Sequence, residues 1–164
     1  PNVPACPYHE HSDLVDAIES RDAERAATLM VEHLRHVEAS LNFERPGDGD
    51  GAVSVFLGTV RNANAGQRVL FLEYEAYASM AEREMERIAA EAVARFGVTK
   101  VAIVHRVGRV EIGEASVAIA VAAPHRAPAM EACRFVIDSL KTSVPIWKRE
   151  HFEGGAVWVE GAGS

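Results

Sequence analysis

The hydrophobic and polar positions after residue 50 fall into short runs of two kinds. In some runs polar side chains alternate with apolar ones, as in 69–77, which is typical of a strand with one polar face. In others the apolar positions recur every three or four residues, which is typical of a helix with one buried face. We therefore predict strands at 51–60, 69–77, 100–108 and 156–161, a strand hairpin at 109–125, and helices at 79–97 and 127–141.

This order of elements predicts an α+β fold, in which a mostly antiparallel sheet packs against helices. The second limb of the hairpin is apolar throughout, so we place it in the centre of the sheet. The polar segment 61–68, RNANAGQR, is interpreted as a mobile loop because it is rich in Asn, Gly and Ala. The segment 141–150, KTSVPIWKRE, is interpreted as an apolar turn bent at Pro145.

The first fifty residues differ in chemistry from the rest of the chain. They predict two helices within 9–41, each with an apolar stripe at three- and four-residue spacing. They carry 11 Asp and Glu against 4 Lys and Arg, whereas the remainder is neutral, so this segment accounts for the net charge of −7. The sequence GDGDG marks a turn at the boundary. We predict a helical hairpin appendage at 1–46, a linker at 47–51 and a second domain at 51–164.

The composition is typical of a soluble globular protein, with 48% hydrophobic and 25% charged residues in a chain of 164. No apolar run approaches the roughly 18–20 residues that span a bilayer. The first residues lack the basic and apolar regions of a secretion signal, so we expect none. Cys6 and Cys133 are too few for a disulfide framework, and we expect both as reduced thiols in a cytoplasmic protein.

Candidate chemistry gathers at the ends of the predicted elements. Arg61 ends a strand, and His125 and Arg126 precede a helix N-terminus, whose unpaired N–H groups favour anions. Lys141 and Lys148 are two of only three lysines in the chain. Several cations in a region of zero net charge indicate an anionic substrate such as a phosphate ester. Each also has a structural interpretation: a loop position for the His–Arg pair, a cation at a helix C-terminus for Lys141, and a surface position for Lys148.

A lysine held near Pro145 and Trp147 is a candidate acid, base or amine nucleophile. His105, at a strand end, is interpreted as a structural histidine. The spacing of these residues alone predicts an anion pocket and does not identify a reaction.

Four motifs resemble, in this order, the catalytic large subunit of molybdopterin synthase: GAVSVFLGTVRN, LEYEAY, HRVGRVEIGEASVAIAVAAPHR and LKTSVPIWKRE. The resemblance covers residues 51–160 and implies the hammerhead fold of that family. It implies an enzyme of molybdenum cofactor biosynthesis, a sulfurtransferase that converts cyclic pyranopterin monophosphate into the dithiolene of molybdopterin. The sulfur would arrive as a thiocarboxylate on the C-terminal glycine of a small ubiquitin-like subunit.

The same resemblance implies a heterotetramer, in which two copies of this chain form a central dimer with one small subunit at each end. It implies no metal or organic cofactor, and we expect neither nucleic acid nor membrane as a partner. Matched motif by motif, the catalytic residues would be Lys141, beside the incoming thiocarboxylate, and Lys148, as general acid/base or pterin contact. The substrate-binding residues would be Arg61, His125 and Arg126.

A second resemblance lies in the first fifty residues. The segment 10–41, EHSDLVDAIESRDAERAATLMVEHLRHVEASL, is similar to the last two helices of the ligand-binding domain of GntR-type transcription regulators of the FCD class. The resemblance implies that His11 and His33 are metal ligands, although the helices that carry the other ligands are absent. It gives an alternative function, a non-catalytic metal-sensing or regulatory module.

Overall fold

The computed structural model describes residues 47–159 and a few residues before them. The chain divides into two units, Pro1–Glu44 and Arg45–Ser164. The fold below is that of the second unit, and the predicted boundaries of appendage and linker stay predictions. The described residues of the first unit are Asp13, Asp16, Ala17, Ser20, Asp22, Glu24, Arg25, Thr28 and Leu29.

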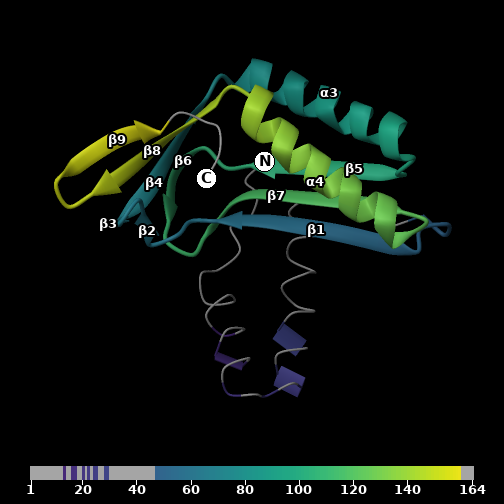
Figure 1. The fold of residues 1–164 in the computed structure, drawn as a ribbon, viewed down its shortest axis with the longest axis horizontal. Helices are drawn as coiled ribbons and strands as arrows, with labels where there is room; N and C mark the ends of the chain where they lie inside the picture. The colour runs from purple at the N-terminus through teal and green to yellow at the C-terminus, as the bar shows by residue number, and fades with distance from the viewer. Residues whose placement is uncertain are drawn as a thin grey trace. The chain divides into compact units, whose positions relative to one another are not determined.

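A three-stranded antiparallel sheet, in the order β1-β7-β5, carries the main core (Figure 1). Its strands are β1 (Ala52–Thr59), β5 (Lys100–His105) and β7 (Ala115–Ala123). The central strand β7 is buried along most of its length, which explains its apolar sequence from Val117 onward. The pairing of β1 with β7 shifts register between Gly58 and Thr59.

The second sheet has four antiparallel strands in the order β6-β4-β8-β9. Its strands are β4 (Phe71–Ala76), β6 (Gly108–Glu111), β8 (Ile146–Phe152) and β9 (Gly155–Val159). A smaller apolar cluster lies under this sheet, made of Val60, Val69, Leu72 and Val110.

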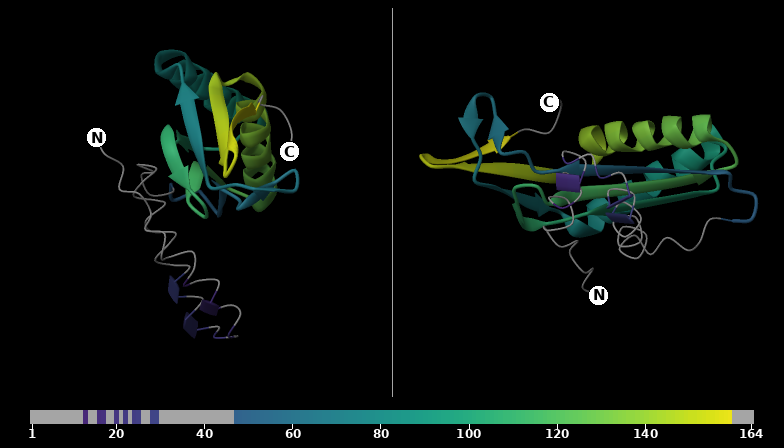
Figure 2. Two further views of the ribbon diagram at one scale, coloured as in Figure 1. Left: turned by 90° about the vertical axis from the view of Figure 1, so that its left-hand side faces the viewer. Right: turned by 90° about the horizontal axis from the view of Figure 1, so that it is seen from below.

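Two helices, α3 (Ala78–Phe96) and α4 (Arg126–Ser143), pack on the same face of the three-stranded sheet (Figure 1 and Figure 2). Their buried side chains meet those of β7 in one cluster that includes Ile88, Ile119 and Val136. Gly97 ends α3 in the left-handed conformation at φ 64°, and its N–H donates to the carbonyl of Val93. Within the described part of the chain, none of the helices has the length and apolar character needed to cross a bilayer.

The predicted α+β fold, with mostly antiparallel strands and helices packed against them, is confirmed. Three local interpretations are wrong. The predicted strand hairpin at 109–125 is instead two strands, β6 and β7, which belong to different sheets and pair with other strands. The segment 61–68 is a hairpin of β2 (Ala63–Asn64) and β3 (Gln67–Arg68) rather than an open loop. The segment 141–150 ends α4 and starts β8, rather than forming a turn. Its strand pattern was hidden because the inward positions of β8 include Lys148 and Glu150, which interrupt the apolar alternation.

Candidate functional site

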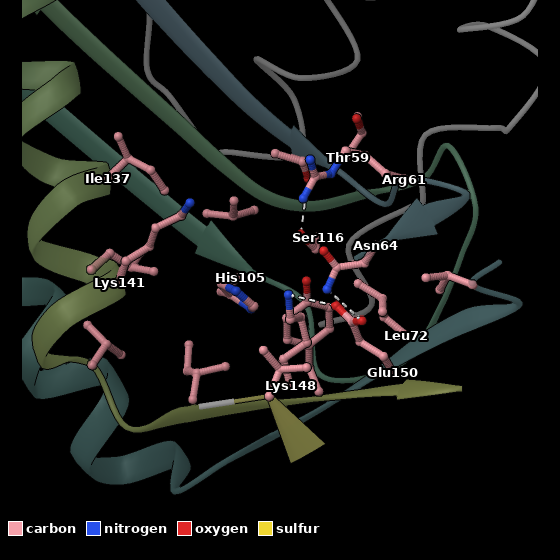
Figure 3. A pocket seen from close by; sticks show the side chains of 18 of the residues that line it. Thr59, Arg61, Asn64, Leu72, His105, Ser116, Ile137, Lys141, Lys148 and Glu150 are labelled. Carbon is pink, nitrogen blue, oxygen red and sulfur yellow. Dashed lines mark hydrogen bonds and ion pairs between the residues drawn. The ribbon is translucent and has the colours of Figure 1, made fainter. Parts of the chain in front are cut away.

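A pocket of about 460 Å³ is lined by both sheets, by β2 and by the last turns of α4 (Figure 3). Its apolar wall comes mainly from the strands and from α4. Its polar side chains include three cations and one carboxylate. The polar lining residues are Thr59, Arg61, Asn64, Tyr74, His105, Ser116, Lys141, Lys148 and Glu150.

Lys148 is held in place by a buried carboxylate. Its Nζ lies 3.0 Å from Oε1 of Glu150, two residues further along β8. Glu150 is only 3% exposed. Its other oxygen, Oε2, accepts a hydrogen bond of 2.9 Å from Nδ2 of Asn64 on β2. Because both carboxylate oxygens are engaged, the charge of Glu150 is compensated and the ammonium group of Lys148 has a fixed position.

His105 lies between Lys141 and Lys148 in the view of the pocket in Figure 3. Its Nδ1 lies 2.8 Å from the backbone oxygen of Arg106. Its ring meets the ring of Tyr74 edge to face, with 5.0 Å between centroids. Burial lowers the pKa of His105 below its ordinary value of 6.5, and the hydrogen bond to Arg106 acts in the opposite direction. The imidazole is therefore neutral at neutral pH.

The phenol of Tyr74 stays protonated beside it. Burial raises the pKa of Tyr74, a hydrogen bond with Ser116 partly opposes this, and the negative charge of Glu150 adds to it. Ser116 is itself buried and donates a hydrogen bond of 3.1 Å from Oγ to the carbonyl of Gly58 on the neighbouring strand β1. These contacts join both sheets at the floor of the pocket.

Gly58 lies on β1 in the pocket wall, tightly packed against β7. A Cβ at this position would lie 2.6 Å from Cγ1 of Val117, its partner across the two strands. Glycine is needed here for close packing of the strands rather than for an unusual backbone angle. The register shift after it redirects the chain, and Thr59 and Arg61 both reach the pocket.

Lys141 and Arg61 are the exposed cations of the site. Lys141 belongs to the last turn of α4, where a cation also complements the helix dipole. Among the residues that the structure describes, neither side chain has an ion-pair partner. Both charges are therefore available to an anionic ligand.

His125 and Arg126 are placed elsewhere. His125 precedes the first residue of α4, Arg126, and both are exposed. An α-helix rises about 1.5 Å per residue, so Arg126 lies about 22 Å along α4 from Lys141. Of the five site residues predicted from the sequence, the structure brings Arg61, Lys141 and Lys148 together in one pocket and leaves these two outside it.

Six polar residues of the pocket were not recognised from the sequence as part of a site, and Asn64, Glu150 and His105 are among them. Alternate residues of a strand point to the same face, so recognition of β8 would have placed Glu150 beside Lys148. The position of Asn64 depends on the β2–β3 hairpin and has no comparable signal. His105 was interpreted as structural, and nothing in its local sequence indicates that it lines a pocket.

His11 and His33, the alternative metal ligands, lie outside the described residues. Within the parts of the chain that are described, no group of three or more His, Cys, Asp or Glu is arranged to hold a metal ion.

The fold and the pocket are those of an α+β protein that brings lysine, arginine and a neutral histidine together at one site. The sequence profile of the MoaE protein family matches residues 22–143, and the chain belongs to this family. The profile of the FCD domain matches residues 4–36. The MoaE match begins at residue 22, inside the segment that we predicted to be an appendage.

Named relatives and solved structures agree with this assignment. Over 151 residues the chain is 43% identical to the molybdopterin synthase catalytic subunit of Oryza sativa subsp. indica, covering 92% of this chain and 72% of that one. The crystal structure of molybdopterin synthase from Staphylococcus aureus superposes with a TM-score of 0.70 at 40% identity, covering 74% of this chain and 88% of that one.

A complex of subunits 1 and 2 of molybdopterin-converting factor from Helicobacter pylori 26695 shares the fold, with a TM-score of 0.60 at 21% identity, covering 82% and 84%. The predicted enzyme class, a molybdopterin synthase catalytic subunit acting in molybdenum cofactor biosynthesis, is confirmed. The metal-sensing alternative is not favoured.

Proposed function

We propose that this chain transfers sulfur from a thiocarboxylated small subunit to cyclic pyranopterin monophosphate and so forms the dithiolene of molybdopterin. The observation that carries the proposal is the meeting of Arg61, Lys141 and Lys148 in one pocket (Figure 3). Cations placed in this way bind a phosphate ester, and they stabilise the negative charge that develops as sulfur moves.

The two lysines differ in their surroundings, and this supports a division of roles. Lys141 is exposed and has no ion-pair partner among the described residues, so its charge is free to meet the thiocarboxylate anion. Lys148 is held 3.0 Å from Glu150, which suits a group that contacts the pterin or donates a proton from a fixed position. Arg61 would take the phosphate, for which a planar guanidinium is well suited.

A ubiquitin-like small subunit is the proposed sulfur donor. A chain that ends in glycine presents its terminal carboxyl group without a side chain, so a narrow tail can enter a pocket of this size. The structural neighbour from Helicobacter pylori was solved as a complex of two subunits, which supports a hetero-oligomer of the same kind.

Homodimerisation would allow His125 and Arg126 to take part in substrate binding. They lie about 22 Å along α4 from Lys141, too far to reach the same substrate within one chain. We place them at the pocket of a second copy, where they would bind the phosphate or the pterin. The assembly is then a heterotetramer of two copies of this chain and two small subunits, acting in the cytoplasm without nucleic acid or membrane.

A reconstituted sulfur-transfer assay tests the function. The full chain is mixed with the thiocarboxylated small subunit and cyclic pyranopterin monophosphate, and mass spectrometry follows the precursor and both forms of the small subunit. We expect the precursor to gain two sulfur atoms while the thiocarboxylate becomes a carboxylate. An unchanged precursor under conditions where the Staphylococcus aureus enzyme is active would rule the function out.

A further inference from the structure

His105 combines three features that its predicted structural role does not require. It lines the pocket, it is mostly buried, and one of its two ring nitrogens is committed to the backbone. The partner of Nδ1 is the carbonyl oxygen of Arg106, which only accepts hydrogen bonds. Nδ1 therefore carries the proton of the neutral ring, and Nε2 keeps a free lone pair.

The surroundings of His105 keep the ring in this state. Tyr74 packs edge to face against it and fixes the plane of the imidazole. The ionisable groups that line the same pocket come from four other segments. They are Tyr74 on β4, Glu150 and Lys148 on β8, Lys141 on α4, and Arg61 after β1. The three cations oppose protonation of the imidazole, and the carboxylate is already paired with Lys148 and Asn64.

The proposed function, on which this inference rests, requires a proton acceptor. Once the thiocarboxylate sulfur has bonded to the precursor, that sulfur still joins the precursor to the acyl carbon of the small subunit. Water must add to the acyl carbon: a C–O bond forms, the C–S bond breaks, and its electron pair stays on sulfur as a thiolate. One proton of the water must be removed, and the carboxylic acid formed loses its own proton to solvent. The step involves no oxidation or reduction.

We propose that Nε2 of His105 accepts the proton of this water, and that His105 thereby releases the small subunit from the sulfurated precursor. The other ionisable groups of the described pocket are unsuited to the task. The lysines and the arginine have no lone pair when charged, and the phenol of Tyr74 is protonated. The carboxylate of Glu150 is engaged at both oxygens.

The variant His105→Asn separates this role from a structural one. The asparagine amide can donate to the Arg106 carbonyl in place of Nδ1, but it offers no base in place of Nε2. We expect the covalent adduct between small subunit and precursor to form at the parent rate. Its hydrolysis should slow by about 10²- to 10⁴-fold, the usual contribution of a general base. Intact-mass measurement of the small subunit through a single turnover distinguishes thiocarboxylate, adduct and carboxylate.

The matched control is His151→Asn. His151 belongs to β8, whereas His105 ends β5. His151 does not line the pocket, and its Nε2 lies 3.1 Å from a carboxylate oxygen of Glu73. Adduct formation and adduct hydrolysis should both be unchanged in this variant. A slow hydrolysis step shared by both histidine variants would indicate loss of rigidity in the sheet and would overturn the role of His105.

The pH dependence of the parent gives a second measurement that does not depend on whether the variant folds. Hydrolysis of the adduct should be constant around neutral pH and decline in acid, below the ordinary histidine pKa, as His105 becomes protonated. A parent that hydrolyses the adduct without this decline, or a folded His105→Asn chain that hydrolyses it at the parent rate, overturns the inference and leaves the sulfur transfer intact. A parent that forms neither adduct nor product overturns the proposed function as well.

Discussion

Lys148 and Glu150 point into the same pocket from one face of β8, with 3.0 Å between Nζ and Oε1. The same carboxylate accepts a hydrogen bond from Asn64, which is 86 residues away in the sequence. One buried acidic residue therefore positions the lysine and ties the β2–β3 hairpin to the four-stranded sheet. Both the stability of the fold and the geometry of the site depend on it.

Replacing Glu150 with glutamine should weaken the fold and the enzyme together. The amide keeps the shape of the side chain and its contact with Asn64, but it leaves the ammonium of Lys148 without a counter-charge. Because that lysine is 25% exposed, we expect a loss of about 1–3 kcal/mol rather than the larger cost of a fully buried charge. Chemical denaturation measures the stability, and the sulfur-transfer assay measures the activity.

Glu111→Gln is the matched control for that substitution. Glu111 also pairs with a cation, Arg109, at 2.6 Å, but both side chains are at least half exposed. Exposed ion pairs contribute little, so its stability should change by less than about 1 kcal/mol, with full activity. Equal effects of the two substitutions would show that the buried carboxylate has no special structural role.

Lys141→Ala should nearly abolish product formation without weakening the fold. The side chain is exposed, so the free energy of unfolding should change by no more than about 0.5 kcal/mol. Loss of one group that stabilises developing negative charge commonly costs about 10²- to 10³-fold in rate. The assay of sulfur transfer measures this directly, with stability followed in parallel.

Arg134→Ala provides the comparison on the same helix. Arg134 is an exposed cation of α4 that contacts Asp138 and does not line the pocket. Arg134→Ala removes a positive charge from the same helix as Lys141→Ala, but from outside the pocket. It should therefore leave the rate of sulfur transfer unchanged. Turnover of Lys141→Ala at the rate of Arg134→Ala would disprove the assigned role of Lys141.

The sequence predicted those elements whose side chains have a single uniform environment. Helices α3 and α4 have one buried face, and β7 is buried along most of its length, so each gives a clear periodicity. Strand β8 was missed because its inward face carries Lys148 and Glu150 among apolar residues. The β2–β3 hairpin is too short for any period, and its turn contains Ala65 at φ 48°, a conformation that alanine rarely adopts.

Only the cations of the site were predictable from the sequence, and not the contacts that bring them together. Positions at or near the ends of predicted elements identified Arg61, Lys141 and Lys148 as candidates. The same signal also selected His125 and Arg126, which lie outside the pocket. The shared environment of the three pocket cations depends on contacts over long sequence separations, which spacing does not reveal. The separation of Arg126 from Lys141 follows directly from the length of α4, 18 residues.

Gly58→Ala should destabilise the pocket wall. The new methyl group would lie 2.6 Å from Cγ1 of Val117, a stiff side chain on the central strand. Overpacking of this kind costs about 1–3 kcal/mol. Val117→Ala removes the clashing atom, so the double variant should lose less stability than the two single variants together, by about 0.5–3 kcal/mol.

A double-mutant cycle by chemical denaturation checks that coupling. Gly154→Ala is the control, since a Cβ there meets nothing within 4 Å, and it should change stability by less than about 0.5 kcal/mol. Strict additivity of Gly58→Ala and Val117→Ala would mean that the two strands relax apart instead of clashing.

The buried neutral state of His105 also predicts how stability depends on pH. Burial lowers the pKa of His105 in the folded chain, whereas in the unfolded chain it has its ordinary value of about 6.5. As the pH falls below that value, the unfolded chain binds a proton that the folded chain does not. The stability that this imidazole contributes to the folded chain is therefore complete above about pH 6.5. It declines on acidification until the pH passes below the folded-state pKa.

The difference in free energy of unfolding between the parent and His105→Asn isolates this effect from the other titrating groups. We expect the difference to be constant from about pH 7.5 to 9, where the imidazole is neutral in both states, which serves as the internal control. Between neutral pH and about pH 5 it should shift in favour of the variant, because only the parent loses the stability linked to this imidazole. A difference that stays constant over the whole range would show that the ring is not held in its neutral form by burial.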